Sequence, residues 1–447
     1  MSNIDNIREH LDLMHRDLLR EELNHLSLSE MLDLWQEMGE DEAMEIFLLL
    51  QLDQKVELIT HLSEAEQEWL LKSLSLEKIR ELLDEIEPDD LADIIQAVSH
   101  DVRSSVWKSL SEEARRETQF LLKFDSDDAA GLMTPRYIAL RSNITVEQAI
   151  HFIRQGVDDI ETIYYVYVVD QLQRIQGVIS LREILFSNNS EVIGSKMSTN
   201  VISVQEDTDQ EEVARILEDY DFIALPVTDR YNRLLGIITF DDVIDVIREE
   251  QTEDIYKMGA MDGSSDIYLE TGIFRLLKKR IPWLILLLLT GTITTNVLAL
   301  TDDILSAAAF LVLFIPVITQ TGGNSGTQSS TLMIRGIAMG HVDFADIGKV
   351  VLKEFLVGVF MGVILGGVII LRSVYLPPGI AWYEGLVIGL SLIFVVLFST
   401  IIGAVAPLLI HKLGWDPTVI AAPLMSTVID VTGLSIYTFT AKMLLGL

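Results

Sequence analysis

Long uncharged stretches in the last third of the chain constrain its fold more than any other feature. A bilayer core about 30 Å thick is crossed by a helix of about 20 residues. Five stretches approach or exceed that length and together contain a single charged side chain, Asp430: 281–300, 304–334, 355–371, 385–410 and 417–441. We therefore predict an α-helical membrane protein with five transmembrane helices in residues 281–447. We expect the second span to be broken, because it contains Pro316 and the pair Gly322-Gly323.

The charge of the chain is concentrated in its first part. Of 67 acidic and 33 basic residues, only eight acids and six bases lie in residues 281–447. Residues 1–280 therefore hold 59 acids and 27 bases, a net charge of −32. Carboxylates at this density repel one another unless cations bind among them, and they also repel nucleic acid. We expect cations, and no nucleic acid, as partners.

Polar side chains inside two of the predicted spans indicate a path for a cation. A carboxylate such as Asp430 costs roughly 2.5–3.5 kcal/mol at the centre of a membrane helix. Ser426 lies four residues earlier, on the same helix face. The second span contributes further hydroxyls and amides, including Asn324 and Thr327. Polar groups are tolerated at this depth where they face protein or a water-filled path.

Each of these features also has a purely structural interpretation. Asp430 can instead pair with a base or bond to a neighbouring helix, although no basic residue lies well inside a predicted span. The Gly and Ser residues of the second span can instead allow close helix packing, and packing and pore lining are compatible. One carboxylate per chain is few for a divalent ion. We therefore hypothesise a symmetric dimer with the pore on its two-fold axis.

The available ligand types favour a hard metal ion. The chain has no cysteine, and its eight histidines are scattered without a metal-binding spacing. Carboxylates, carbonyls and hydroxyls are the ligands that Mg²⁺ and Ca²⁺ prefer. Mg²⁺ also sheds its water reluctantly, which suits a path lined by uncharged polar groups.

Residues 1–130 are predicted to form an acidic helical domain. Leucines and isoleucines recur at helical spacing, as in Ile79, Leu82 and Leu83, and polar breaks such as Ser63 and Pro88 separate the segments. Short units of similar sequence recur, which is typical of a stacked helical array. An irregular all-α domain remains an equal alternative.

An internal repeat occupies residues 131–195 and 196–250. Each copy has a helix (146–154 and 211–220), two β-rich strands joined by a turn (170–173 and 229–232), and a closing helix. This pattern resembles a tandem pair of CBS domains, which are α/β modules that often bind adenine nucleotides. The resemblance implies Thr239 and Asp242 as candidate contacts for a nucleotide such as ATP.

Residues 251–280 are predicted to be a connector helix that runs along the membrane surface into the first span. The segment begins acidic and ends basic. Basic residues flank one side of the spans, so the positive-inside rule places the N-terminal domains in the cytoplasm and the C-terminus outside. We expect a multi-pass protein of the plasma membrane, with lipid around its spans.

Together these features resemble the MgtE family of Mg²⁺ channels and transporters, most clearly in residues 321–328 and 430–434. The resemblance implies a homodimer with its pore between the subunits. It also implies a hydrated Mg²⁺ near Asp430, surrounded by Gly323, Thr327 and Ser426. The family senses cytoplasmic Mg²⁺ through acidic residues, which here match Glu57, Asp89, Asp93, Asp209, Glu211, Asp221, Asp242, Asp245, Glu250, Glu253 and Asp254.

We therefore predict a Mg²⁺-selective channel or transporter that mediates influx and is closed by its own cytoplasmic substrate. Mg²⁺ between the acidic domains would hold the pore shut, and carboxylate repulsion at low Mg²⁺ would release it. The sequence has no Walker A motif and no phosphorylation-type Asp motif, so we expect no enzyme activity. Two alternatives remain open: a membrane-anchored CBS nucleotide sensor, and a transporter for another divalent ion such as Co²⁺ or Mn²⁺.

Overall fold

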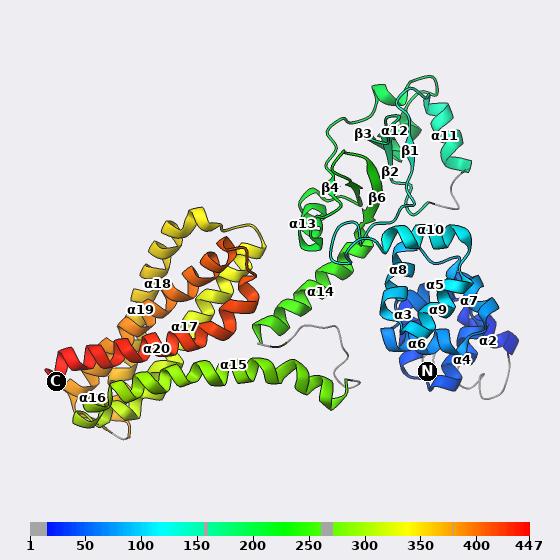
Figure 1. Ribbon diagram of the computed structural model, residues 1–447. Helices are drawn as coiled ribbons and strands as arrows, with labels where there is room; N and C mark the ends of the chain where they lie inside the picture. The colour runs from blue at the N-terminus through cyan, green and yellow to red at the C-terminus, as the bar shows by residue number, and fades with distance from the viewer. Residues whose placement is uncertain (1–15, 156–159, 260, 262–270, 378) are drawn as a thin grey trace. The chain divides into compact units, whose positions relative to one another are not determined.

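The computed structural model describes residues 16–155, 160–259, 261, 271–377 and 379–447. The chain forms two compact units, Met1–Val246 and Ile247–Leu447. Figure 1 shows both units, and each is described by itself below.

Short amphipathic helices follow one another through the first part of the first unit. Polar or acidic residues precede most of them, and Ser27 and Ser111 accept hydrogen bonds from main-chain N–H groups of the helices that they begin. Their apolar faces form one core, from Leu19 to Ala114, which agrees with the predicted helical array. The helices are α2 (Arg16–Leu23), α3 (Leu28–Gln36), α4 (Glu40–Leu49), α5 (Leu52–Thr60), α6 (Glu64–Ser73), α7 (Leu76–Leu83), α8 (Pro88–Ala97), α9 (His100–Ser109) and α10 (Glu112–Leu121).

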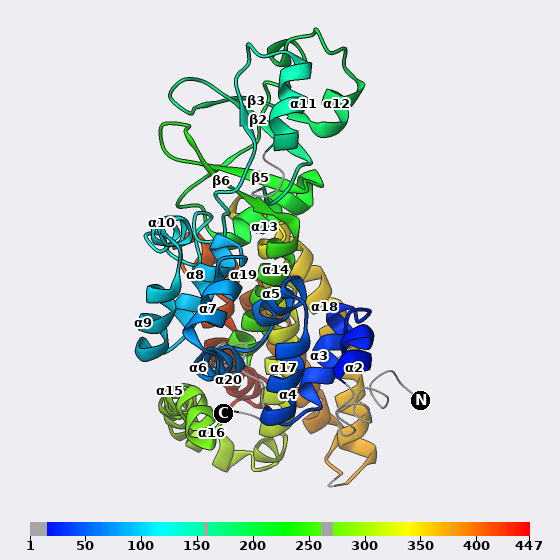
Figure 2. The same ribbon diagram turned by 90° about the vertical axis from the view of Figure 1, so that its right-hand side faces the viewer.

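Two small sheets confirm the predicted repeat, and in Figure 2 the first lies above the second. In each sheet the first strand is parallel to the second, and the second is antiparallel to the third. Gln173 and Asn232 take left-handed backbone conformations, with φ of 63° and 62°, in the predicted turns. The elements are β1 (Ala139–Leu140), α11 (Val146–Gln155), β2 (Tyr165–Val169), β3 (Ile175–Ser180), α12 (Leu181–Phe186), η2 (Ile193–Ser195), β4 (Val204–Gln205), α13 (Gln210–Tyr220), β5 (Ala224–Thr228), β6 (Leu234–Thr239) and α14 (Phe240–Met258).

The connector is not a single helix over residues 251–280, which corrects that expectation. Residues 251–258 are the end of α14, which begins as the closing helix of the second CBS copy. No glycine or proline interrupts α14 before Gly259, so nothing in the sequence stops the helix at residue 250. Residues 273–280 are the beginning of α15 (Ile273–Leu300), and residues 262–270 lie outside the described chain.

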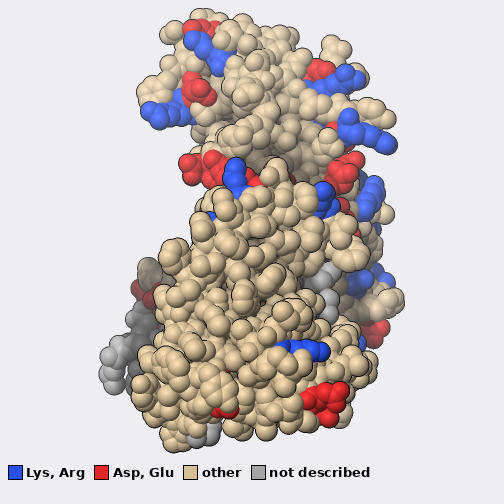
Figure 3. Space-filling model, turned by 90° about the vertical axis from the view of Figure 1, so that its left-hand side faces the viewer, with Lys and Arg blue, Asp and Glu red and all other residues tan. Residues whose placement is uncertain are grey.

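Long helices make up the second unit. The central one, α19 (Trp382–Lys412), packs against α17 (Phe310–Ala338), α18 (Ile347–Tyr375) and α20 (Pro417–Leu445). Two short elements, α16 (Asp302–Ala307) and η3 (Phe344–Asp346), join longer ones. Charged side chains are sparse over the broad face of this unit in the lower half of Figure 3, and α15 has no buried side chain.

Four of the five predicted spans are confirmed by length and composition. Among the described residues, the helical segments that are long and apolar enough to cross a membrane are Ile273–Leu300, Phe344–Tyr375, Trp382–Lys412 and Met425–Leu445. The predicted span at 304–334 corresponds mainly to α17, which has 29 residues but is not among the four. Its run of Thr, Gln, Asn and Ser residues lowers its hydropathy.

The expectation of a broken second span is wrong, because α17 is continuous through Pro316 and Gly322-Gly323. Helix-breaking residues are tolerated in membrane helices, where neighbouring helices help to satisfy freed main-chain groups. Gly322, and Gly326 one turn later, instead allow close packing. A Cβ atom on Gly326 would lie 2.1 Å from Cδ1 of Ile429, and one on Gly403 would lie 2.2 Å from the main-chain oxygen of Gly326.

Replacing Gly403 by Ala is therefore expected to destabilise the second unit by about 1–3 kcal/mol or more, the usual cost of overpacking. The obstructing atom belongs to the backbone of α17 and cannot rotate away. Gly367→Ala is the matched control, since a Cβ atom there has no neighbour within 4 Å. The check is the thermal unfolding temperature of detergent-solubilised protein, and equal temperatures for the two variants would contradict the close packing of α17 on α19.

Candidate functional site

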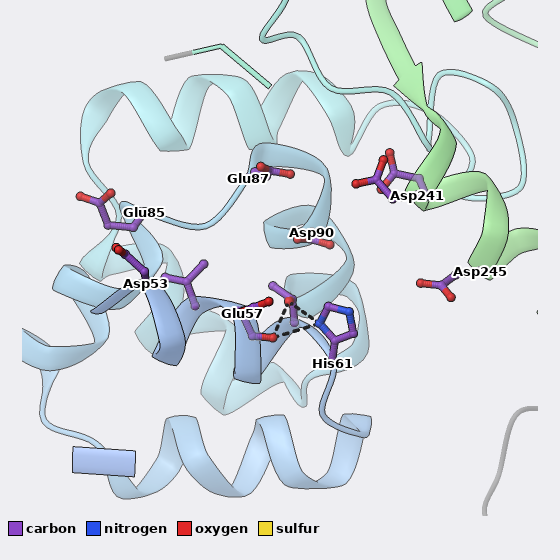
Figure 4. A pocket seen from close by; sticks show the side chains of 11 residues that line it. Asp53, Glu57, His61, Glu85, Glu87, Asp90, Asp241 and Asp245 are labelled. Carbon is purple, nitrogen blue, oxygen red and sulfur yellow. Dashed lines mark hydrogen bonds between the residues drawn. The ribbon is translucent and has the colours of Figure 1, made fainter. Parts of the chain in front are cut away.

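An acid-lined cavity of about 770 Å³ lies in the first unit, between the helical array and the second CBS copy. Figure 4 shows carboxylates entering it from α5, from the start of α8 and from the start of α14. Among the described residues that line it, His61 is the one basic side chain, and its Nδ1 lies 2.9 Å from the main-chain oxygen of Glu57. The lining residues are Asp53, Val56, Glu57, Thr60, His61, Glu85, Glu87, Asp90, Asp241, Asp242 and Asp245.

Two carboxyl groups of the cavity lining, and one beside it, have raised pKa values. Burial, and then the neighbouring Glu87, raise the pKa of Asp90 to about 6. Burial also raises the pKa of Asp242 to about 7, against the opposing hydrogen bond from Thr239. Burial and the charges of Asp242 and Asp90 raise the pKa of Asp89 well above its ordinary value. A bound cation would remove much of this cost of ionisation.

Glu161, just before β2 in the first CBS copy, joins the same group of acids. Burial and the adjacent Glu87, to which it is hydrogen-bonded, raise the pKa of Glu161 to about 10. Within the described part of the chain, Oδ1 of Asp89 and Oε2 of Glu161 are buried without a hydrogen-bond partner. An unsatisfied buried oxygen costs about 1–3 kcal/mol. The array and both CBS copies thus contribute to one electrostatically strained cluster.

The structure brings together some of the predicted sensor acids but not all. Glu57, Asp242 and Asp245 line the cavity, and Asp89 is buried beside Asp242. Asp93 is exposed on α8 and does not line the cavity. No group of three or more His, Asp or Glu side chains in the described residues is already arranged around a single ion position.

Three other predicted acids lie at the ends of α13. Asp209 begins that helix and accepts a hydrogen bond of 2.9 Å from the main-chain N–H of Glu211. Asp221 ends it in a left-handed conformation, with φ of 53°. Partial burial and four nearby aspartates raise the pKa of Asp128. Those four aspartates are Asp125, Asp207, Asp209 and Asp127.

The last predicted group lies at the end of α14, where a lysine is already present. Nζ of Lys257 lies 3.0 Å from a carboxylate oxygen of Glu253 and 3.0 Å from one of Asp416. Asp416 begins α20, and its other oxygen accepts a hydrogen bond of 2.7 Å from the main-chain N–H of Thr418. The side chain of Asp254 also bonds to Thr418, and Glu250 is half-buried on the same helix. These contacts join α14 to α20 within the second unit.

The CBS pair contains a second, smaller cavity of about 180 Å³. Aromatic and small side chains line it, including Tyr165, Phe222 and Ala224. The predicted nucleotide contacts are elsewhere: Thr239 and Asp242 are hydrogen-bonded to each other, and Asp242 lines the acidic cavity instead.

The predicted pore residues lie on accessible faces of the second unit. Asn324, Thr327 and Ser426 are exposed, whereas Gly323 and Asp430 are half-buried. On the other side of α17, Gly322 and Gly326 lie against Ile429, the residue before Asp430. The polar segment of α17 around Asn324 and the segment of α20 around Asp430 therefore lie side by side in the unit.

Comparisons with known proteins identify the parts of the chain. The family profile described as "Divalent cation transporter", MgtE, matches residues 315–440. The profile "MgtE intracellular N domain" matches residues 26–127, and the CBS domain profile matches residues 129–188 and 190–249. The chain is 43% identical to the magnesium transporter MgtE of Thermus thermophilus over 336 residues, which cover 74% of this chain and 73% of that protein.

The chain belongs to the MgtE family. It is also 35% identical to the magnesium transporter MgtE of Enterococcus faecalis over 334 residues, covering 74% of this chain and 72% of that protein. The MgtE family is one of transporters, in agreement with the prediction that the chain is not an enzyme.

The cytosolic parts of solved MgtE-like structures resemble the first part of this chain. The crystal structure of the cytosolic domain of the Mg²⁺ channel MgtE in complex with ATP is similar, with a TM-score of 0.53 and 40% identity. The similarity covers 54% of this chain and 99% of that one. The soluble part of a magnesium transporter gives a TM-score of 0.52 and 31% identity, covering 56% of this chain and 98% of that one.

Sequence reasoning missed several acids of this MgtE chain that the fold brings together. Asp90 and Asp241 stand beside the predicted Asp89 and Asp242, so the acidic runs already pointed to them. Glu87 and Glu161 gave no signal, because they are 74 positions apart in the sequence and meet only in the folded chain, where their side chains are hydrogen-bonded.

Proposed function

We propose that this MgtE family member carries Mg²⁺ across the membrane along the accessible polar faces of α17 and α20. One observation carries the proposal: polar side chains lie on the accessible surface of a unit whose helices are long and apolar enough to cross a membrane. These residues are Asn324, Thr327, Ser426 and Asp430. Polar groups at membrane depth require protein or water beside them. Uncharged oxygens and one carboxylate suit a Mg²⁺ ion that keeps most of its water.

In this proposal α17 is a fifth transmembrane span. A second copy of the chain packs over the polar face formed by α17 and α20 and shields it from lipid. A helix of 29 residues is about 43 Å long at 1.5 Å per residue, enough to cross a bilayer. A two-fold axis beside Asp430 would place two carboxylates around one path, halving the charge that each must neutralise. The homodimer would thus shield the polar face from lipid and provide a second carboxylate for the ion.

The acidic cavity is proposed as the cytoplasmic Mg²⁺ sensor. Two carboxylates about 5 Å apart repel by roughly 3 kcal/mol at an effective dielectric constant near 20. Mg²⁺ among Glu57, Asp89, Asp242 and Asp245 would turn that repulsion into attraction and hold the array against the second CBS copy. The helix α14 begins at this cavity and ends at the Lys257–Asp416 contact with α20. Bridging ions would therefore bias α20 towards a closed path.

The remaining assignments follow the same proposal. Residues 1–130, 131–195 and 196–250 form the cytoplasmic sensor, residues 251–280 connect it, and residues 281–447 form the pore in the plasma membrane, with the C-terminus outside. The outlying acids Asp93, Asp209, Glu211, Asp221, Glu250 and Asp254 are further proposed Mg²⁺ contacts of the sensor. Glu253 already pairs with Lys257, so it becomes a Mg²⁺ contact only where that lysine is displaced.

ATP binding in the CBS pair is a second candidate function, favoured by the cavity beside Tyr165 and Phe222. Aromatic side chains stack on adenine, and the cytosolic domain of a similar Mg²⁺ channel was crystallised with ATP. In this proposal ATP tunes the sensor, whereas tight ATP binding without any ion flux would support an anchored nucleotide sensor. Permeation of Co²⁺ or Mn²⁺ is tested by the same flux assay.

The deciding experiment is Mg²⁺ uptake into proteoliposomes, with Mg²⁺ on the side of the acidic domains set low and then high. We expect flux at low Mg²⁺ that is strongly reduced at high Mg²⁺. Flux that ignores this Mg²⁺ would refute the sensor and leave the pore intact. Absence of flux at every concentration would refute the transport proposal.

A further inference from the structure

A carboxyl group is buried among the helices of the second unit, outside every site described above. Glu354 on α18 is 8% exposed. Its Oε2 accepts a hydrogen bond of 2.8 Å from Oγ of Ser329 on α17. The hydroxyl of Thr400 on α19 lies 3.4 Å from the main-chain oxygen of Glu354. Three long helices therefore meet at one acidic residue.

The surroundings of Glu354 leave little room for rearrangement. One turn further along α18, a Cβ atom on Gly358 would lie 2.6 Å from Oγ1 of Thr400. Nearly one turn further along α19, Gly403 lies against the backbone of Gly326. Both α17 and α18 are thus pressed against α19, and the Glu354–Ser329 hydrogen bond is a direct polar link between them.

Ser329 and the proposed pore residues occupy opposite faces of α17. Successive residues of an α-helix are turned by about 100°. Ser325, Gly326 and Ser329 therefore share one face, which is buried, whereas Asn324 and Thr327 share the opposite face, which is exposed. Between residues 322 and 331 both faces are polar or small, so hydrophobicity specifies the rotation of this part of α17 poorly. A hydrogen bond from the buried face, which has a preferred direction, can fix the rotation of the helix about its axis.

We propose that Glu354 is a positioning residue that fixes the rotation of α17 about its own axis and so keeps Asn324 and Thr327 on the exposed face. The inference rests on the proposed function for its relevance to transport. Its test measures which face of α17 is accessible and requires no Mg²⁺ flux.

Because the natural chain has no cysteine, a single introduced cysteine reports on one position. Thr327→Cys probes the exposed face, and Ser325→Cys probes the buried face, where the serine is 4% exposed. The measurement is the ratio of their modification rates by N-ethylmaleimide in detergent-solubilised full-length protein. We expect Thr327→Cys to react at least about tenfold faster in the otherwise natural chain, a difference of about 1.4 kcal/mol.

Adding Glu354→Ala is expected to reduce this ratio several-fold, and Ser329→Ala should have the same effect. Glu354→Gln should largely restore the ratio, because its amide oxygen can accept the hydrogen bond from Ser329. Ser373→Ala is the control, since it removes a buried hydroxyl that donates a hydrogen bond to the main-chain oxygen of Ile370 on its own helix. If Glu354→Ala fails to fold, Ser329→Ala, which removes only a hydroxyl, carries the same expectation.

An unchanged ratio in folded Glu354→Ala or Ser329→Ala would overturn the positioning role. A ratio in Glu354→Gln as low as in Glu354→Ala would also overturn it, because the hydrogen bond would not be the cause. A charged, membrane-impermeant thiol reagent tests the pore separately. If that reagent fails to reach Thr327→Cys in proteoliposomes while the N-ethylmaleimide ratios behave as expected, the pore proposal fails and the positioning role stands.

Discussion

Replacing Asp430 by Asn is expected to reduce Mg²⁺ flux by at least about fifteenfold while the protein remains folded. A doubly charged ion about 5 Å from a carboxylate is stabilised by about 1.7 kcal/mol even at the dielectric constant of water, and by more inside a protein. That energy corresponds to about fifteenfold in ion occupancy. The amide of Asn has nearly the same shape but no charge, so the variant isolates the electrostatic contribution. The measurement is Mg²⁺ uptake into proteoliposomes at low sensor-side Mg²⁺.

Asp303→Asn is the matched control for this experiment, because it removes one carboxylate from the short helix α16, outside the proposed path. We expect nearly unchanged flux for the control. Near-normal uptake by Asp430→Asn would show that the carboxylate has a structural role and would remove the main support for a pore along α20.

The thermal stability of the protein in EDTA is expected to fall as the pH rises from about 4 to about 7, and excess Mg²⁺ should reverse much of that fall. Burial and neighbouring acids raise the pKa of Asp90 to about 6. Burial raises the pKa of Asp242 to about 7. In the unfolded chain an Asp carboxyl has a pKa of about 3.9. Between these values the folded protein binds more protons, so the free energy of unfolding decreases with rising pH.

The expected loss is several kcal/mol, because each unit of pKa difference corresponds to about 1.4 kcal/mol. It is absent below about pH 4 and complete for these two groups above about pH 7. Bound Mg²⁺ would favour the ionised carboxylates, so its stabilising effect should be larger at pH 8 than at pH 5. The measurement is the thermal unfolding temperature of the full-length protein in detergent across this pH range, with EDTA or with Mg²⁺.

The double variant Asp90→Asn, Asp242→Asn should flatten the pH dependence and weaken the response to Mg²⁺. Asp219→Asn, which removes an exposed acid of α13 away from the cavity, should leave both unchanged. A double variant with the full natural pH dependence would show that the cavity acids do not cause it.

Local sequence patterns predicted the CBS repeat well, because its turns and strands depend on short-range chemistry. The turns at Gln173 and Asn232 and the alternation around them identify each hairpin without tertiary information. The continuity of α17 was not predictable in this way. Its glycines resemble helix breaks in a sequence, and their role in packing appears only when Gly326 meets Gly403 and Ile429.

The candidate site residues also differ in whether a local sequence pattern reveals them. Asp430 stands out in the sequence, because a carboxylate in an apolar stretch is conspicuous wherever it occurs. Glu354 does not, because it directly precedes the third predicted span and resembles an ordinary charged flank. The structure extends α18 back to Ile347 and buries the carboxyl group against Ser329. Glu161 was missed because its neighbours come from distant segments.

The lysine at the end of α14 has a consequence for how steeply the proposed gate responds to Mg²⁺. Lys257 is a covalently attached cation among Glu253 and Asp416, so this link between α14 and α20 persists when Mg²⁺ is absent. A site neutralised by lysine contributes no ion to the closing reaction. The Hill coefficient for closure by Mg²⁺ should therefore reflect the ions of the acidic cavity and of the other sensor acids, and exclude this junction. Replacing Lys257 by Met would free the two carboxylates for an additional Mg²⁺ and make the concentration response steeper.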